Sequence, residues 1–189
     1  MTKCAPQNPH MKIIKKLERV MIIGRPGGGK STFSLKLQKI LQIPLYHLDK
    51  YFYIDHWQPK DYEEFLAIQQ QLIDSPSWII DGNSTKSYEN RYAKSDLCLY
   101  FNFPRYQCYW RIFKRLFHKH PDIDDRAENC KETIRWSLIT YMWNFEDRVT
   151  DLLCTLQKKY PDVVFIEIRN TSDLANLEAI IRKTVTSGV

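Results

Sequence analysis

The sequence predicts an α/β protein in which a parallel β-sheet carries helices on both faces. Short apolar runs alternate along the chain with longer segments of helical periodicity. The first apolar run leads directly into a turn with three adjacent glycines, and an amphipathic segment follows that turn. A length of 189 residues suits one domain with its own core. We therefore expect residues 1–189 to form a single domain, of which residues 1–15 are a flexible extension.

Five apolar runs predict the strands of this sheet. Each run is short and ends at a glycine, a proline or a polar residue, as buried strands do. The predicted strands are Val20–Ile23, Pro44–Leu48, Ser77–Asp81, Leu97–Phe103 and Val163–Ile168. Ligands of such sheets lie beyond the carboxyl ends of the strands. The residues that follow these runs are therefore candidate site residues.

Helical periodicity and end signals predict the helices between the strands. Asp61 and Glu64 resemble a capping box at the start of one helix, and Pro161 ends a long one. The predicted helices are residues 33–41, a segment beginning at Asp61, residues 104–118, residues 132–159 and a closing helix around Leu174–Ile181. Residues 117–131 contain few apolar side chains and a mixture of charges, so we predict a lid segment there.

The glycine turn reads GRPGGGKST and matches the P-loop pattern G-x-x-x-x-G-K-S, with a strand before it and a helix after it. Backbone N–H groups in such a loop form an anion nest, and the helix directs its positive end at the same point. Lys30 is expected to reach the β- and γ-phosphates and Ser31 to ligate Mg²⁺. The predicted nucleotide-binding residues of this turn are Gly24, Arg25, Pro26, Gly27, Gly28, Gly29, Lys30, Ser31 and Thr32.

Composition narrows the class of partner. Hydrophobic residues make up 43% of the chain and charged residues 26%, which is typical of soluble globular proteins. The net charge of +6 favours anionic ligands. The 5 dispersed cysteines include no C-x-x-C pair, so neither a zinc site nor a disulfide framework is expected, and reduced thiols indicate the cytoplasm. No apolar run is long enough to predict a membrane span.

Several arginines in the second half of the chain are candidate phosphate ligands. Arg111 and Arg115 follow the fourth strand at a spacing that places them on one helix face. Guanidinium groups bind phosphate oxygens in pairs and keep their charge. Arg126 lies in the polar stretch, and Arg135 near the start of the next helix. A merely solvated basic face is the alternative interpretation.

The order of five stretches resembles that of the nucleoside monophosphate kinases of the adenylate-kinase type, and more closely that of the bacterial topology-modulation proteins. These stretches are GRPGGGKST, LYHLDKYFY, WIIDGN with Arg91 downstream, YFNFPRYQCYWR with Arg115, and ENCKETIRW. The resemblance extends from Val20 to about Leu174. It implies a P-loop NTPase of adenylate-kinase type, with a five-stranded parallel sheet, a lid after the fourth strand, and phosphoryl transfer from ATP with Mg²⁺.

The resemblance also implies roles for individual residues. It puts Lys30 and Ser31 at the donor phosphates, Asp81 on the metal side, and Arg91 at an acceptor phosphate. The remaining implied nucleotide and lid ligands are Arg111, Arg115, Arg126, Arg135, Arg169 and Asn170. One departure is clear: adenylate kinases read D-G-F-P-R after the third strand, whereas this chain reads DGNST from Asp81 to Thr85. The missing arginine argues against AMP as the acceptor.

The segment after the second strand is similar to the acceptor region of uridine-kinase-type enzymes. Asp49 there would take the proton from an attacking hydroxyl, and Tyr51 and Tyr53 would contact the acceptor. A turn or cap role for Asp49 is the alternative. His47 is expected to be a packed or hydrogen-bonded strand residue. We expect Trp110, Trp136 and Trp143 to lie in the core.

The leading hypothesis is a cytoplasmic Mg·ATP-dependent kinase that phosphorylates a nucleotide, a nucleoside or another small acceptor. Its predicted catalytic residues are Lys30, Asp49, Arg115, Arg126 and Arg135. The alternative is a nucleotide-binding regulatory protein linked to DNA topology and without kinase turnover, which the basic charge favours. No helix-turn-helix or other nucleic-acid motif is visible. The sequence indicates no oligomeric state.

Overall fold

The structure is a computed structural model that describes residues 17–54, 56, 58–117 and 136–187. A five-stranded sheet lies at its centre, with the strand order β2-β3-β1-β4-β5. Every neighbouring pair of strands runs parallel, which confirms the predicted sheet. The strands are β1 (Arg19–Gly24), β2 (Leu45–His47), β3 (Trp78–Asp81), β4 (Leu97–Phe101) and β5 (Val164–Ile168).

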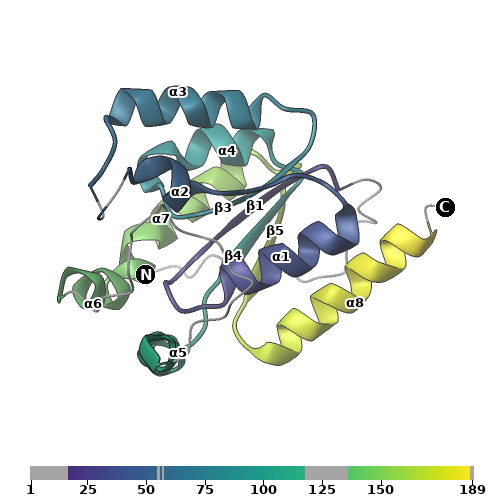
Figure 1. Ribbon diagram of the computed structural model, residues 1–189. Helices are drawn as coiled ribbons and strands as arrows, with labels where there is room; N and C mark the ends of the chain where they lie inside the picture. The colour runs from purple at the N-terminus through teal and green to yellow at the C-terminus, as the bar shows by residue number, and fades with distance from the viewer. Residues whose placement is uncertain (1–16, 55, 57, 118–135, 188–189) are drawn as a thin grey trace.

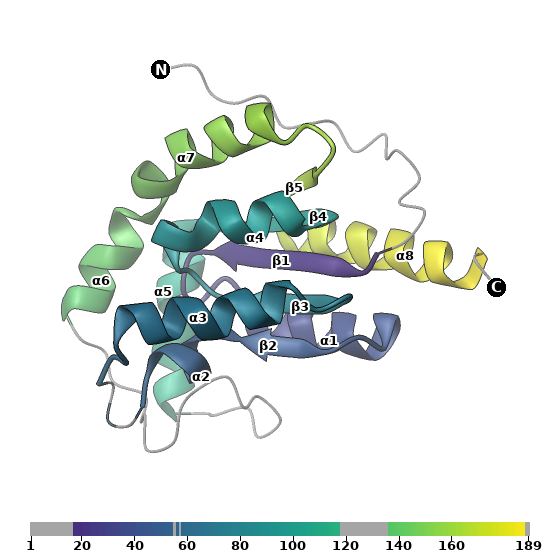
Figure 2. The same ribbon diagram turned by 90° about the horizontal axis from the view of Figure 1, so that it is seen from above.

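Helices cover both faces of this sheet, as predicted. In Figures 1 and 2, α1 and α8 lie on one face, whereas α3, α4 and α7 cover the other. The helices are α1 (Lys30–Leu41), α2 (Leu48–Phe52), α3 (Tyr62–Ile73), α4 (Tyr88–Lys94), α5 (Arg105–Phe117), α6 (Trp136–Trp143), α7 (Phe145–Lys159) and α8 (Thr171–Ser187), with a 3₁₀ turn η1 (Thr85–Ser87) before α4.

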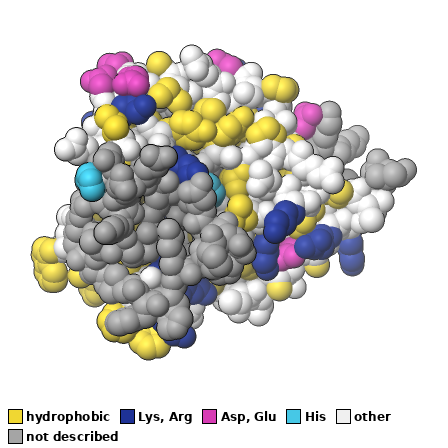
Figure 3. All heavy atoms as spheres, viewed as in Figure 1, with side chains coloured by type: hydrophobic (Ala, Val, Ile, Leu, Met, Phe, Trp, Pro, Cys, Tyr) yellow, Lys and Arg dark blue, Asp and Glu magenta, His cyan; other side chains and the backbone are white. Residues whose placement is uncertain are grey.

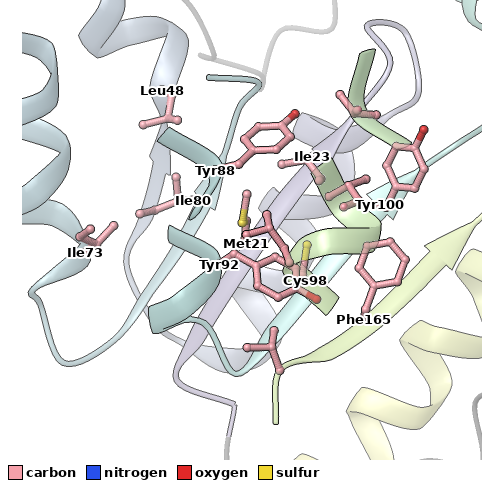
Figure 4. Packing of buried hydrophobic residues seen from close by; sticks show 14 of the residues in the cluster. Met21, Ile23, Leu48, Ile73, Ile80, Tyr88, Tyr92, Cys98, Tyr100 and Phe165 are labelled. Carbon is pink, nitrogen blue, oxygen red and sulfur yellow. The ribbon is translucent and has the colours of Figure 1, made fainter. Parts of the chain in front are cut away.

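The central strand β1 supplies side chains to both layers of the core. Met21 and Ile23 pack in the cluster that includes side chains of α3, α4 and α7, and Val20 and Ile22 pack in the cluster that includes side chains of α1 and α8. Figure 4 shows Met21 close to Tyr92 of α4 within the first cluster. A strand that is buried on both faces reads as an unbroken apolar run, and this is why the run in β1 could be recognised.

The long helix predicted over residues 132–159 is wrong in the part that the structure describes. It is divided into α6 and α7, with Asn144 between them. At the division, the Met142 carbonyl accepts a hydrogen bond from Arg25 Nε at 3.0 Å, a partner from outside both helices. Helical periodicity continues through Asn144, so the local sequence did not indicate the division. The contact made at this point comes from Arg25, which is distant in the chain.

Two further expectations need correction. Asp49 does not end the second strand, because β2 ends at His47 and Asp49 lies in the first turn of α2. The three tryptophans assigned to the core are exposed: Trp110 by 58%, Trp136 by 76% and Trp143 by 56%. Figure 3 shows hydrophobic side chains at the surface over α5 and α6. Helix α5 instead buries Cys108 and Ile112.

Some predicted segments lie outside the described residues. They are the extension over residues 1–15 and the lid segment beyond Phe117, which includes Arg126, as well as Arg135. Within the described part of the chain, no helix combines the length and the apolar character that crossing a membrane requires.

The start of α3 provides a test of the capping prediction. Asp61 accepts hydrogen bonds from the backbone N–H groups of Glu63 at 3.0 Å and Glu64 at 3.1 Å. We expect Asp61→Ala to lower the free energy of unfolding by about 1 kcal/mol, because these two N–H groups lose their partner. Denaturant unfolding of Asp61→Ala and of the control Asp61→Ser, which keeps a capping oxygen, measures the effect. Equal losses in both variants would contradict the capping role.

Candidate functional site

The turn between β1 and α1 has the conformation that its glycines allow. Gly27 has a φ of +78° and Gly29 a φ of +92°, both in the left-handed region. A Cβ at Gly27 would overlap the backbone carbonyl oxygen of Cys108 in α5. Helix α1 begins at Lys30, directly after Gly29. The turn therefore brings backbone N–H groups and the positive end of a helix to one place, which is a suitable site for a phosphate.

Side chains from two other elements hold this turn in position. Asn83, just after β3, accepts a hydrogen bond from the Gly24 N–H at 3.1 Å and donates one to the Gly24 carbonyl at 2.7 Å. Arg111 of α5 donates to the Gly28 carbonyl at 3.2 Å, and its guanidinium lies 4.5 Å from the centre of the Phe103 ring. Arg111 thus stands beside the loop, as predicted, with its charge available at the phosphate site.

Arg25 has a different position from the other residues of the loop. Its side chain is only 1% exposed and does not line the cavity described below. It donates to the carbonyls of Phe103 at 2.8 Å and Met142 at 3.0 Å, and lies 3.5 Å from a carboxylate oxygen of Glu146. The guanidinium therefore joins the loop to the end of β4 and to the division between α6 and α7. It is a structural group, so a nucleotide contact of Arg25 could involve only its backbone.

Ser31, His47 and Asp81 meet at the carboxyl ends of β1, β2 and β3. Asp81 accepts a hydrogen bond from the Ser31 hydroxyl at 2.9 Å and lies 3.1 Å from His47 Nδ1, both through Oδ2. Burial by itself would raise the pKa of Asp81, but the hydrogen bond with His47 and the charge of Lys30 hold it below its ordinary value. Asp81 is thus a carboxylate at neutral pH, and His47 is the hydrogen-bonded strand residue that was expected.

These residues fit a magnesium ion. Asp81 Oδ1 is buried and has no hydrogen-bond partner within the described part of the chain. Mg²⁺ prefers oxygen ligands, and next to nucleotide phosphates it is held by a serine or threonine hydroxyl and an aspartate carboxylate. Ser31 and Asp81, the two predicted metal ligands, lie within hydrogen-bond distance of each other, and their role as ligands stays a prediction.

A cavity of about 1090 Å³ opens in front of the loop. It brings together many of the predicted site residues, which come from four segments of the chain. The predicted residues that line it are Pro26, Gly27, Gly28, Gly29, Lys30, Ser31, Thr32, Asp49, Tyr53, Asp81, Arg111 and Arg115. Such a volume is large enough for a nucleotide or a similar ligand.

One side of the cavity belongs to the elements that follow β4 and β5. Arg111 and Arg115 of α5 line it, together with Thr171 and Leu174 of α8. The two residues predicted beside the adenine, Arg169 and Asn170, are not among its described lining residues. Arg169 pairs with Glu167 at 2.7 Å, and the Asn170 side chain accepts from the Asp173 N–H at 2.9 Å near the start of α8.

The other side of the cavity belongs to the elements that follow β2 and β3. Asp49 of α2 and Tyr53 line it, as predicted, whereas Tyr51 does not. Tyr51 packs against the core and against Tyr46, with ring centres 6.3 Å apart. Burial raises the pKa of Tyr141 to about 12, and the nearby Asp49 carboxylate adds to that shift. Tyr141 of α6 therefore stands close to Asp49 in this part of the cavity.

The position of Arg91 corrects its predicted role as an acceptor ligand. The side chain is fully buried, and it donates to the carbonyls of Gly82 at 3.0 Å and Ser84 at 3.1 Å. Burial lowers the pKa of Arg91 to about 10, so the group stays charged at neutral pH. Arg91 lies outside the cavity lining and holds the segment after β3 in place from behind.

Sequence reasoning missed several residues of the site. Asn83 was read only as a departure from a motif, although it holds Gly24 in place. Tyr62, Lys86 and Tyr141 line the cavity from α3, η1 and α6. The position of Asn83 directly after a strand was a usable signal, since other site residues share it. No local pattern marks Tyr141, because its place depends on how α6 meets the sheet.

Comparisons with known proteins give a limited result. No protein-family model matches the chain, and no curated protein is significantly similar to it. Among solved structures, the chain is similar to a deoxyadenosine kinase from M. mycoides with bound dATP. The two share 15% sequence identity at a TM-score of 0.47, and the match covers 86% of this chain and 97% of that chain. Both values are too low to assign a reaction or substrate, and the resemblance to topology-modulation proteins stays a prediction.

The buried Arg91 can be tested by stability. We expect Arg91→Met to lower the free energy of unfolding by about 1–3 kcal/mol, because the carbonyls of Gly82 and Ser84 lose their donors inside the protein. Arg182→Met, which removes an exposed arginine paired with Glu178, is the control and should change stability by less than about 0.5 kcal/mol. Denaturant unfolding measures both, and an unfolding curve of Arg91→Met that matches the wild type would exclude the structural role.

Proposed function

We propose that the chain is an Mg·ATP-dependent phosphotransferase that transfers the γ-phosphoryl group of ATP to a small acceptor. One observation carries the proposal. A glycine loop with Lys30 and the hydrogen-bonded Ser31–Asp81 pair faces the same cavity as Asp49, which comes from α2. The loop, Lys30 and the Ser31–Asp81 pair can bind a charged phosphate chain and its metal ion. Asp49 can take the proton of an attacking hydroxyl.

The donor side of the reaction is mainly a matter of charge and position. Lys30 lies at the start of α1, where its ammonium donates to the Arg25 carbonyl at 3.4 Å. It can turn from this carbonyl to the β- and γ-phosphate oxygens of a bound nucleotide. Arg111 stands beside the same loop, and Arg115 lines the cavity one helical turn later. Fixed positive charges of this kind stabilise the charge on a transferring phosphoryl group without reorganisation.

Ser31 and Asp81 are the residues that would hold the magnesium ion. The ion supplies charge neutralisation and orientation of the phosphates when it is bound. His47 keeps the Asp81 carboxylate oriented and ionised through the contact of 3.1 Å. The Asp81 and His47 side chains are buried, which lowers the local dielectric and strengthens the interaction with an incoming cation.

The acceptor side depends on Asp49. Its carboxylate lines the cavity in the first turn of α2, two residues after His47. A carboxylate in this place can take the proton of an acceptor hydroxyl as the hydroxyl attacks. The kinase hypothesis accordingly gives Asp49 the role of general base.

The distribution of basic residues favours the kinase over the regulatory protein. Lys30, Lys36, Arg111, Lys114 and Arg115 all line the cavity. On the face of α1 and α8 in Figure 3, basic side chains lie next to an acidic one, and Arg182 there pairs with Glu178 at 2.9 Å. A cluster of basic side chains thus faces a cavity that suits a small anionic ligand.

Loss of the loop lysine tests the donor site. We expect Lys30→Ala to lower kcat by about a hundred- to a thousandfold, because it removes a fixed charge from the transferring phosphoryl group. Lys39→Ala changes an exposed lysine in the last turn of the same helix and serves as the control. ATP consumption across an acceptor panel of nucleoside monophosphates, nucleosides and small hydroxyl compounds is the assay. Wild-type turnover in Lys30→Ala would refute the proposed function.

The role of Asp49 separates acceptor chemistry from donor binding. We expect Asp49→Asn to lower kcat by about a hundredfold or more while ATP affinity changes less than about threefold, since a general base acts on the acceptor. Asp74→Asn, at the exposed end of α3, is the matched control. Steady-state kinetics and ATP-binding calorimetry give the two readings. Normal turnover with weakened ATP binding would instead place Asp49 on the donor or metal side.

A further inference from the structure

The two sides of the cavity differ in charge. On the side of α1 and α5, the ionisable lining residues other than Asp81 are all basic: Lys30, Lys36, Arg111, Lys114 and Arg115. On the side of α2, α3 and η1, the described lining residues include one carboxylate, Asp49, and one ammonium, Lys86. The first side therefore suits a polyanion, whereas the second has balanced charge.

Aromatic rings make up much of the wall on the balanced side. Phe52 contacts Tyr53 and Phe65 edge to face, with ring centres 4.8 Å and 5.1 Å apart. The ring of Tyr62 lies 6.1 Å from that of Phe65. All four side chains line the cavity. A row of rings held by its own edge-to-face contacts offers a preformed apolar surface on which a flat ring can pack.

Two cations near this wall, Arg91 and Lys86, are not placed to hold a phosphate group. The Arg91 guanidinium is buried behind the segment after β3 and donates to backbone carbonyls. The Lys86 ammonium lies 5.2 Å from the centre of the Tyr62 ring, over its face. Asp49 adds a negative charge on the same side, which would repel a phosphate dianion. Binding a phosphate there would require paired guanidinium contacts, and no arginine is among the described lining residues on this side of the cavity.

We infer that the acceptor is an uncharged compound of the nucleoside type, with a flat ring and a free hydroxyl, rather than a nucleoside monophosphate. This inference rests on the proposed phosphotransferase function. The ring packs against the aromatic wall, and the hydroxyl lies at Asp49. A bond forms between the hydroxyl oxygen and the γ-phosphorus, while the bond from that phosphorus to the β,γ-bridging oxygen breaks. ADP leaves with the electron pair of that bond, and the hydroxyl proton passes to the Asp49 carboxylate.

The first test compares acceptors with the full chain, Mg²⁺ and γ-labelled ATP. The panel contains purine and pyrimidine nucleosides and the 5′-monophosphate of each. We expect label in the nucleosides, with kcat/KM about tenfold or more above that of the matching monophosphates, because one charged contact changes affinity by about that factor. Equal or better transfer to the monophosphates would overturn the inference and leave the phosphotransferase proposal standing.

Absence of transfer to every acceptor would count against the phosphotransferase proposal instead. The inference about the acceptor is then decided by calorimetry with a non-hydrolysable ATP analogue present. Tighter binding of a nucleoside than of its monophosphate supports it. Tighter binding of the monophosphate, or no binding of any nucleoside, overturns it.

A variant tests the aromatic wall itself. We expect Tyr53→Ser to raise KM for the nucleoside by about fivefold or more, the loss typical of one stacked ring, with ATP affinity retained. Tyr106→Ser removes a ring that is 71% exposed on α5 and is the matched control. If Tyr53→Ser does not fold, Tyr62→Ser at the start of α3 takes its place. An unchanged nucleoside KM in the folded variant would overturn the role of the wall.

Discussion

The glycine loop between β1 and α1 can adopt its shape because it has few side chains, and for the same reason it cannot hold that shape alone. Two side chains from elsewhere and one of its own hold it. Asn83 makes two hydrogen bonds with the backbone of Gly24, and Arg111 makes one with Gly28. Arg25 extends from the loop itself to carbonyls of β4 and α6 segments. A preformed anion site needs such support. Fixing the loop in one conformation costs conformational entropy, and the loop's own few side chains make too few contacts to offset that cost.

The same contacts join the parts of the site to one another. Asn83 comes from the segment after β3, which also supplies Asp81, and Arg91 supports that segment from the core. Arg25 connects the loop to the division between α6 and α7, and α6 carries Tyr141 into the cavity. Donor side, metal ligands and acceptor wall therefore share one framework. A change in any of these buried polar contacts would shift more than one of them, since such groups are costly to leave unpaired.

Charge and ring placement then divide the cavity by function. The basic side chains gather next to the loop, where a phosphate chain would lie, and the aromatic rings gather beyond Asp49. Asp81 stays ionised despite its burial because His47 and Lys30 compensate for the loss of water. The arrangement suits the charged donor and the less polar acceptor that we propose for this site.

The sequence by itself determined the local features of this protein. The five strands, the loop with Lys30 and Ser31, and the capping of α3 by Asp61 all depend on residues that are neighbours in the chain, so pattern and spacing predict them. The tertiary structure decided the rest. It placed Arg91 in the core and left the tryptophans of α5 and α6 exposed. The reason is physical: whether a side chain is buried depends on which segments pack around it, and no local pattern encodes which segments meet.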